Sequence, residues 1–114
     1  MQQFAEQPRA FVPLAEIDGQ LAGFAILHVE GESGYIVTLD VDEAFRRKGI
    51  AQVLMERVVV HARETGAAVL FLHVFERNQA AIAFYDHAGF EQVGEDDEFY
   101  GNGLNALIYR RLLG

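Results

Sequence analysis

A short basic segment carries the clearest chemical signal in the sequence. Three consecutive cations stand directly before a glycine, at Arg46, Arg47, Lys48 and Gly49. An amphipathic segment begins at Ile50, and the first turn of a helix binds anions such as phosphate through unpaired N–H groups and a partial positive charge. Cations are mildly unfavourable at that end of a helix, which favours a bound anion; the alternative is a solvated basic turn. Gly49 and Ala51 would let the backbone approach the anion closely.

A second dense segment runs from Leu72 to Phe90. Each of its features has a structural explanation, since Asn78 suits a helix N-cap, Tyr85 can pack in the core and Gly89 can end the helix. The two segments together are more specific than either alone.

Two helices and a buried strand position these segments. Apolar residues recur at three- and four-residue spacing from Ile50 to Ala62, which predicts an amphipathic helix that ends at Thr65-Gly66. The run Val69–Val74, interrupted only by His73, predicts a strand buried on both faces with parallel neighbours. A second helix is expected over Gln79–Ala88.

Strands account for most of the remaining chain. They are predicted over Phe11–Ile17, Leu21–Val29, Tyr35–Val41, Phe90–Gly94 and Leu104–Leu112. Asp18-Gly19 lies between the first two and favours a hairpin with a type I′ turn. The acidic run Glu95–Glu98 is expected in the loop between the last two. The predicted order is β-β-β-α-β-α-β-β.

Composition limits the class of protein. With 114 residues, 51% of them hydrophobic and 23% charged, the chain is expected to form one domain over residues 1–114, with residues 1–10 as a frayed or disordered strand. The absence of cysteine excludes disulfides and a thiol nucleophile. A net charge of −8 argues against nucleic-acid binding and favours a cationic partner such as an amine. No apolar run suits a membrane span or a signal peptide, so we expect a cytoplasmic protein without a membrane partner.

Taken together, the two segments resemble a known family. Arg46-x-x-Gly49-x-Ala51 is similar to the acetyl-CoA pyrophosphate loop of the Gcn5-related N-acetyltransferases (GNAT). The second segment reads Asn78-x-x-Ala81-Ile82-x-Phe84-Tyr85-x-x-x-Gly89-Phe90. It resembles the family's second hallmark motif, in the version common among protein N-terminal acetyltransferases of the ribosomal-protein-alanine type. Phe99-Tyr100…Asn105-Ala106 resembles the Tyr-Tyr…Asp-Ala segment of that subgroup. The resemblance implies an α/β fold with a mixed sheet, lacking most of the family's first strand and its first two helices.

The resemblance also implies a role for each motif. Acetyl-CoA would be the cosubstrate, without a metal. Backbone groups of Leu39, Asp40 and Val41, at the end of a splayed strand, would hold the pantetheine arm and the acetyl carbonyl. Asn78 would bond the pantetheine arm. The pyrophosphate would be wrapped by Arg46, Arg47, Lys48, Gly49, Ile50, Ala51 and Gln52. Tyr85 would be the general acid, because a phenol pKa near ~10 is close to that of an alkyl thiol. Tyr100 would contact the acceptor substrate.

The general base is left open by the sequence. In the N-terminal acetyltransferases a glutamate on the strand before the Asn78 position typically accepts the amine proton, and here His73 occupies that position. A neutral imidazole, with an ordinary pKa of about 6.5, can do the same work. The alternative is that His73 is a hydrogen-bonded but inert residue in a buried strand. His28 and Glu30 are weaker candidates, and some amine reaches the site already deprotonated.

Two departures from the family pattern concern the acceptor. Complete members usually begin with a strand and two helices that form one wall of the acceptor site, whereas only about ten residues precede the first clear strand here. We therefore expect a compact variant, a fragment, or a chain completed by a partner subunit, and exposed apolar surface predicts a homodimer. Asn105 replaces the usual aspartate, which weakens assignment to peptide N-termini and keeps a small-molecule amine open. The acidic run suits a cationic acceptor.

The sequence thus predicts transfer of an acetyl group from acetyl-CoA to a primary amine, which would be a protein N-terminus, a lysine or a small molecule. The amine would attack the thioester directly in a ternary complex, with positioning and polarisation of the carbonyl supplying most of the rate. The alternative is a non-catalytic acyl-CoA-binding domain or subunit. The intact motif around Asn78 and Tyr85 favours the enzyme.

Overall fold

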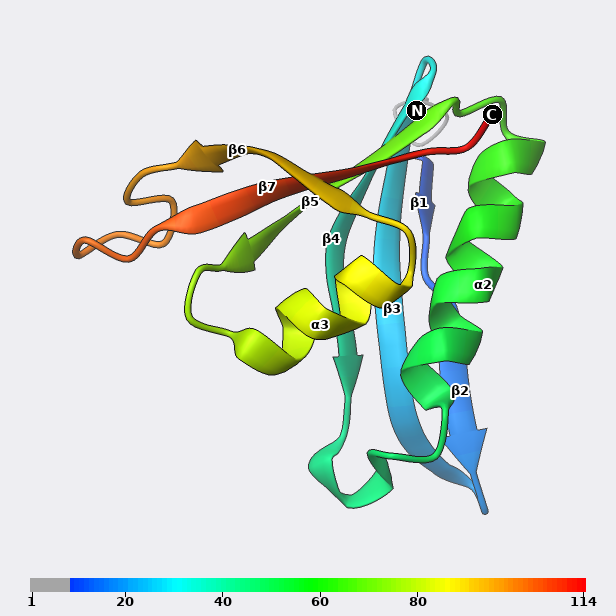
Figure 1. The fold of residues 1–114 in the computed structure, drawn as a ribbon. Helices are drawn as coiled ribbons and strands as arrows, with labels where there is room; N and C mark the ends of the chain where they lie inside the picture. Colours follow the sequence, from blue (N-terminus) through cyan, green and yellow to red (C-terminus); the bar gives the residue numbers. More distant parts are fainter. Residues whose placement is uncertain (1–8) are drawn as a thin grey trace, which may run out of the picture.

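The order of helices and strands follows the sequence-based prediction closely. The computed structural model describes residues 9–114. Its strands are β1 (Arg9–Phe11), β2 (Leu14–Ile17), β3 (Gln20–Glu30), β4 (Ser33–Val41), β5 (Val69–Phe75), β6 (Glu91–Asp96) and β7 (Ala106–Leu112). Its helices are the short 3-10 helix η1 (Glu43–Phe45) and the α-helices α2 (Ile50–Glu64) and α3 (Gln79–His87) (Figure 1).

The first predicted strand is divided into β1 and β2, which both pair antiparallel with β3. Pro13 lies at the break, where it has no N–H to give to a strand ladder, and its carbonyl accepts from the Ala25 N–H at 3.1 Å. Residues 1–8 of the expected frayed segment lie outside the described residues, whereas Arg9 and Ala10 belong to β1.

The predicted hairpin turn at Asp18-Gly19 is present. Asp18 has φ 52° and Gly19 has φ 81°, so both central residues adopt the left-handed region that a type I′ turn requires. The turn fixes the register in which β2 runs back along β3.

The strands form one sheet whose two halves meet along a short parallel ladder. The order is β1-β3-β4-β5-β7-β6, with β2 beside β3. Among the strands of residues 9–114, only β4 and β5 pair in parallel, and their register runs from Ser33↔Val69 to Ile36↔Leu72. Beyond that point β4 continues to Val41 and β5 to Phe75, and the two strands diverge (Figure 1). Beyond Ile36 and Leu72 the facing edges of the two strands are therefore no longer paired with each other.

The expectation that β5 is buried on both faces is wrong. Leu70, Leu72 and Val74 are buried in the core cluster that also contains residues of α2 and α3, whereas Phe71 and Phe75 are only partly buried. Both helices pack on the same face of the sheet, so the alternate residues of β5 remain partly exposed on the other face. Its second neighbour, β7, is antiparallel.

The boundaries at the end of the chain also differ from the prediction. Glu95 and Asp96 were expected in a loop, but they belong to β6 and pair with Leu107 and Ala106 of β7. Pairing with a long neighbouring strand outweighs the low strand propensity of acidic residues. Leu104, expected to begin the last strand, lies in the preceding turn, where its N–H donates to the Gly101 carbonyl.

Gly23 sets the spacing between β3 and the end of β4. A Cβ at Gly23 would lie 2.7 Å from the Asp40 carbonyl oxygen and 3.3 Å from the Leu54 side chain. We expect Gly23→Ala to lower the free energy of unfolding by about 1–3 kcal/mol, because backbone must move to admit the methyl group. Urea unfolding measures the change. Gly94→Ala is the control, since its Cβ would meet only ordinary contacts at 3.6 Å; equal losses in the two variants would contradict the argument.

Candidate functional site

The basic segment forms a loop between β4 and α2, as predicted. Gly49 is the N-cap of α2 with φ 77° and gives no side-chain hydrogen bond to the first turn. Arg47 also has a positive φ of 67°. Because the first turn of α2 contains no acidic residue, its N–H groups and the exposed Arg47 and Lys48 side chains can act together on an anion.

Arg46 fastens this loop to the end of β4. Its Nε donates to the Val41 carbonyl at 3.2 Å, so the side chain holds the loop in place at least as much as it supplies charge. Ile50 is buried beside Ala22 and Leu54, so only its backbone is available to a ligand. Arg46 and Ile50 therefore hold the loop in place, whereas the side chains of Arg47 and Lys48 are exposed.

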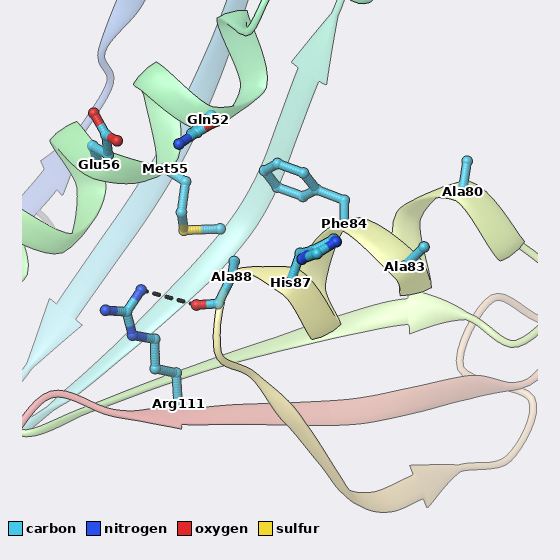
Figure 2. Close-up of a pocket in the computed structure, with 9 residues that line it drawn as sticks. All are labelled: Gln52, Met55, Glu56, Ala80, Ala83, Phe84, His87, Ala88 and Arg111. Carbon is cyan, nitrogen blue, oxygen red and sulfur yellow. Dashed lines mark hydrogen bonds between the residues drawn. The ribbon is translucent and has the colours of Figure 1, made fainter.

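A cavity of about 770 Å³ lies between α2 and α3 (Figure 2). Its lining residues are Gln52, Met55, Glu56, Ala80, Ala83, Phe84, His87, Ala88 and Arg111. Of these, sequence reasoning selected only Gln52 as a binding residue. The small side chains of Ala80 and Ala83 leave room on the facing side of α3, and Arg111 donates from Nη1 to the Ala88 carbonyl at 3.0 Å (Figure 2). The cavity thus continues from the first turn of α2 toward the C-terminal end of α3.

The end of β4 presents backbone groups to the gap beside β5. Asp42 donates its N–H to the Ala22 carbonyl on β3 at 2.8 Å. Successive residues of a strand direct their N–H and C=O groups to alternate edges, so Asp40 also faces β3, whereas Leu39 and Val41 face the gap. Of the three predicted residues, Leu39 and Val41 therefore have backbone groups on the side of β5. Asp40 has its backbone groups on the side of β3, so only its side chain is available to a ligand.

Tyr85 projects from α3 into the core and is only 9% exposed. Its ring packs edge-to-face against Phe84 and Phe90. Burial, with the nearby charge of Asp40 and then Tyr100, raises the pKa of Tyr85 to about 12. Because this pKa lies far above 7, the Tyr85 hydroxyl is protonated at neutral pH. Among the described residues no side-chain hydrogen bond engages that hydroxyl, so its proton is available to a ligand.

The raised pKa of Tyr85 makes stability depend on alkaline pH. The folded state holds the phenolic proton up to a pKa of about 12, while an unfolded chain loses it near ~10. The free energy of unfolding is therefore expected to fall between those pH values, by up to about 2–3 kcal/mol. Tyr85→Phe should reduce this fall when urea unfolding is measured from pH 9 to 12. An unchanged pH dependence in the variant would contradict the assignment.

Asn78 is the N-cap of α3, as predicted. Its Oδ1 accepts from the Ala81 N–H at 3.1 Å, and its side chain is exposed. The side-chain oxygen is thus committed to the helix, which leaves the Nδ2 amide as the group that can donate to a ligand.

His73 lies on the face of the sheet opposite the helices and has partners at both ring nitrogens. Nδ1 is 2.7 Å from the Tyr35 hydroxyl, and Nε2 is 3.1 Å from Asp96 Oδ2. The Phe99 ring stacks on the imidazole with the ring centroids 3.9 Å apart. Sequence reasoning selected none of these three partners. The register Tyr35↔Phe71 would have indicated the first of them had the parallel pairing been known.

Tyr100 lies in the loop between β6 and β7. Its ring is edge-to-face with Phe75 and Phe99. Tyr100 contributes to the raised pKa of both Tyr85 and Tyr35, so it lies within electrostatic reach of the tyrosine on each face of the sheet. The predicted contact of Tyr100 with the acceptor substrate stays a prediction.

In residues 9–114, the structure contains no group of three or more side chains arranged to hold a metal ion. Neither α-helix of that range has the length and apolarity that crossing a bilayer requires.

The mixed sheet, the divergence of β4 from β5 and the basic loop before α2 define the class of fold to which the chain belongs. The acetyltransferase (GNAT) family model matches residues 1–90, and the chain belongs to that family. The match, with the mixed sheet and its two helices, confirms the family resemblance and the fold class drawn from the sequence.

Individual relatives agree with this assignment. The chain is 31% identical over 83 residues to the [ribosomal protein bS18]-alanine N-acetyltransferase of Escherichia coli, covering 73% of this chain and 56% of that protein. It is 38% identical over 94 residues to streptothricin acetyltransferase of Streptomyces lavendulae, covering 81% and 49%. The crystal structure of the E. coli ribosomal-protein-S18-alanine enzyme superposes with a TM-score of 0.85 at 26% identity, covering 97% and 75%. The chain spans about half the length of the curated relatives.

Proposed function

We propose that this chain transfers an acetyl group from acetyl-CoA to a primary amine in a ternary complex, as a single domain. The observation that carries the proposal is the divergence of β4 from β5 directly beside the basic loop. Relatives that are named as acetyltransferases of a ribosomal protein and of streptothricin support it.

The coenzyme is proposed to lie along three features already described. Its pyrophosphate accepts hydrogen bonds from the first turn of α2 and attracts Arg47 and Lys48. Its pantetheine arm pairs with the backbone of Leu39 and Val41, and the Asn78 amide donates to it. The remainder lies along the cavity that begins at Gln52.

The chemistry rests on the groups at the gap. The amine attacks the thioester carbonyl, whose developing negative charge is stabilised by backbone N–H groups of β4. Tyr85 donates its proton to the departing thiolate, which forms in the same poorly solvated region, where burial also raises the thiol pKa. His73 is proposed as the base that takes the amine proton.

The acceptor is proposed to be cationic, and Tyr100 is proposed to contact it. Acidic side chains lie on this side of the molecule, with Asp40 beside the gap and Asp96 beside His73. Their charge would concentrate a cationic amine at the site. We also propose that the enzyme works in the cytoplasm, where acetyl-CoA is available, and that it forms a homodimer. Exposed apolar side chains such as Val37 and Leu104 support the dimer, which light scattering tests.

The test combines binding with turnover. Calorimetric titration with acetyl-CoA should show one site per chain, and release of free thiol should follow addition of an amine from a panel of peptides, lysine derivatives and polyamines. Tight binding without turnover for any amine would favour the alternative of a non-catalytic acyl-CoA-binding domain. Absence of binding would contradict both.

A further inference from the structure

A continuous chain of hydrogen bonds crosses the face of the sheet that the helices leave open. It runs from the Tyr35 hydroxyl on β4 to His73 on β5 and from His73 to the Asp96 carboxylate on β6. The strand β7 lies between β5 and β6, and its Ala106 is the residue paired with Asp96. A methyl side chain at that position lets the aspartate reach His73 over β7.

The chemistry of the two end groups fixes where the protons lie. An ionised carboxylate only accepts hydrogen bonds, so the nitrogen that faces Asp96 carries the proton. A neutral imidazole has one N–H, and Nδ1 is then the lone pair that accepts from the Tyr35 hydroxyl. The reverse tautomer would place a lone pair against a carboxylate and lose that hydrogen bond.

We propose that Asp96 is a positioning residue that holds His73 in the Nε2–H tautomer and thereby makes Tyr35 the route by which a proton reaches the imidazole. This inference rests on the proposed function, in which His73 accepts the amine proton. In the transfer, the bond from the amine nitrogen to hydrogen breaks and a bond to the Tyr35 oxygen forms. The original Tyr35 proton passes to Nδ1, and the positive charge ends on an imidazolium that faces Asp96.

The surroundings of the chain fit this role. Tyr35 and His73 lie beside the last pair of the parallel ladder, Ile36↔Leu72, where β4 and β5 begin to diverge. The Tyr35 hydroxyl, where the proposed proton route begins, therefore lies near the point at which the two strands are last paired. Burial, then Tyr100 and Asp96, raises the pKa of Tyr35, which keeps its hydroxyl protonated and able to donate.

Phe99 completes the arrangement. Its ring is stacked on the imidazole with an angle of 3° between the planes, and the His73 side chain is only 17% exposed. Stacking limits rotation of the ring, while Asp96 selects which nitrogen bears hydrogen. The groups that face the imidazole edges are Tyr35 and Asp96, and the Phe99 ring covers one of its faces.

Nitrogen-15 NMR of the imidazole tests the tautomer directly on the intact chain, with or without acetyl-CoA. We expect the native protein to show the Nε2–H form of His73. Asp96→Asn presents an amide that can also donate, so the Nδ1–H form should become populated. The carboxylate of Asp96→Glu should restore Nε2–H. A native Nδ1–H form, or an unchanged tautomer in Asp96→Asn, would overturn the inference.

Kinetics supplies the second readout. Asp96→Asn should lower kcat roughly 10- to 100-fold with the KM for acetyl-CoA unchanged, and Asp96→Glu should recover part of the loss. Glu64→Gln, which removes an exposed carboxylate at the end of α2, is the control and should match the native rate. Equal rates in Asp96→Asn and Glu64→Gln would overturn the positioning role. If the native chain acetylates no amine, the proposed function fails, and the NMR result still decides whether Asp96 sets the tautomer.

Discussion

Replacing Tyr85 by phenylalanine is expected to lower kcat by roughly 10²- to 10³-fold and to leave the affinity for acetyl-CoA unchanged. The substitution removes one hydroxyl from a buried ring that packs between Phe84 and Phe90, so the shape of the core is kept. What is lost is the proton that the leaving thiolate needs. Because the hydroxyl makes no side-chain hydrogen bond within residues 9–114, no buried partner is left unsatisfied.

Calorimetry and steady-state kinetics on the same preparation measure the two halves of this prediction. Tyr109→Phe is the matched control, because Tyr109 is also a buried tyrosine, 4% exposed, but lies on β7 away from the gap. Its kcat should remain close to that of the native chain. A Tyr85→Phe variant that turns over at the native rate would remove Tyr85 from the mechanism, whatever its affinity for the coenzyme.

The double change Arg47→Ala with Lys48→Ala is expected to weaken acetyl-CoA binding about 10- to 100-fold. Both side chains are exposed beside the first turn of α2, and each loses a charge-assisted contact with the pyrophosphate. Arg46 is left intact because its Nε hydrogen bond holds the loop against Val41. Calorimetric titration at low and high salt measures the loss, which should shrink as salt screens the charges.

Arg57→Ala serves as the control for the double variant. Arg57 is exposed on α2 but lies two turns beyond the loop, so removing its charge should change the affinity little. A similar loss in both proteins would mean that net charge, and not the loop, governs binding. A double variant that binds as tightly as the native chain would contradict the assignment of the pyrophosphate site.

The parts of the fold that short stretches of sequence determine were predicted well. The hairpin at Asp18-Gly19 follows from two residues that tolerate positive φ. The helix from Ile50 follows from its apolar spacing, and the start of α3 follows from the capping side chain of Asn78. The basic loop was found for the same reason, since its residues are consecutive.

The parts that depend on distant pairing were not predicted. Tyr35 and His73 are separated by 38 positions, and His73 and Asp96 by 23, so their contacts follow only from the order and register of four strands. The sequence-based prediction placed Asp96 in a loop and not on β6, so it did not indicate the contact of Asp96 with His73. The cavity was missed because its walls depend on how α2 and α3 lie relative to each other, and a single helix does not determine that.

The early divergence of β4 from β5 makes the central sheet an interrupted one. The two halves are joined by four residue pairs, after which a strand edge in the middle of the sheet has no neighbour of its own. In the proposed complex, the pantetheine arm of the coenzyme would take the place of that neighbour as an added strand, recognised through main-chain atoms that every residue possesses. Recognition of this kind places few demands on side-chain identity.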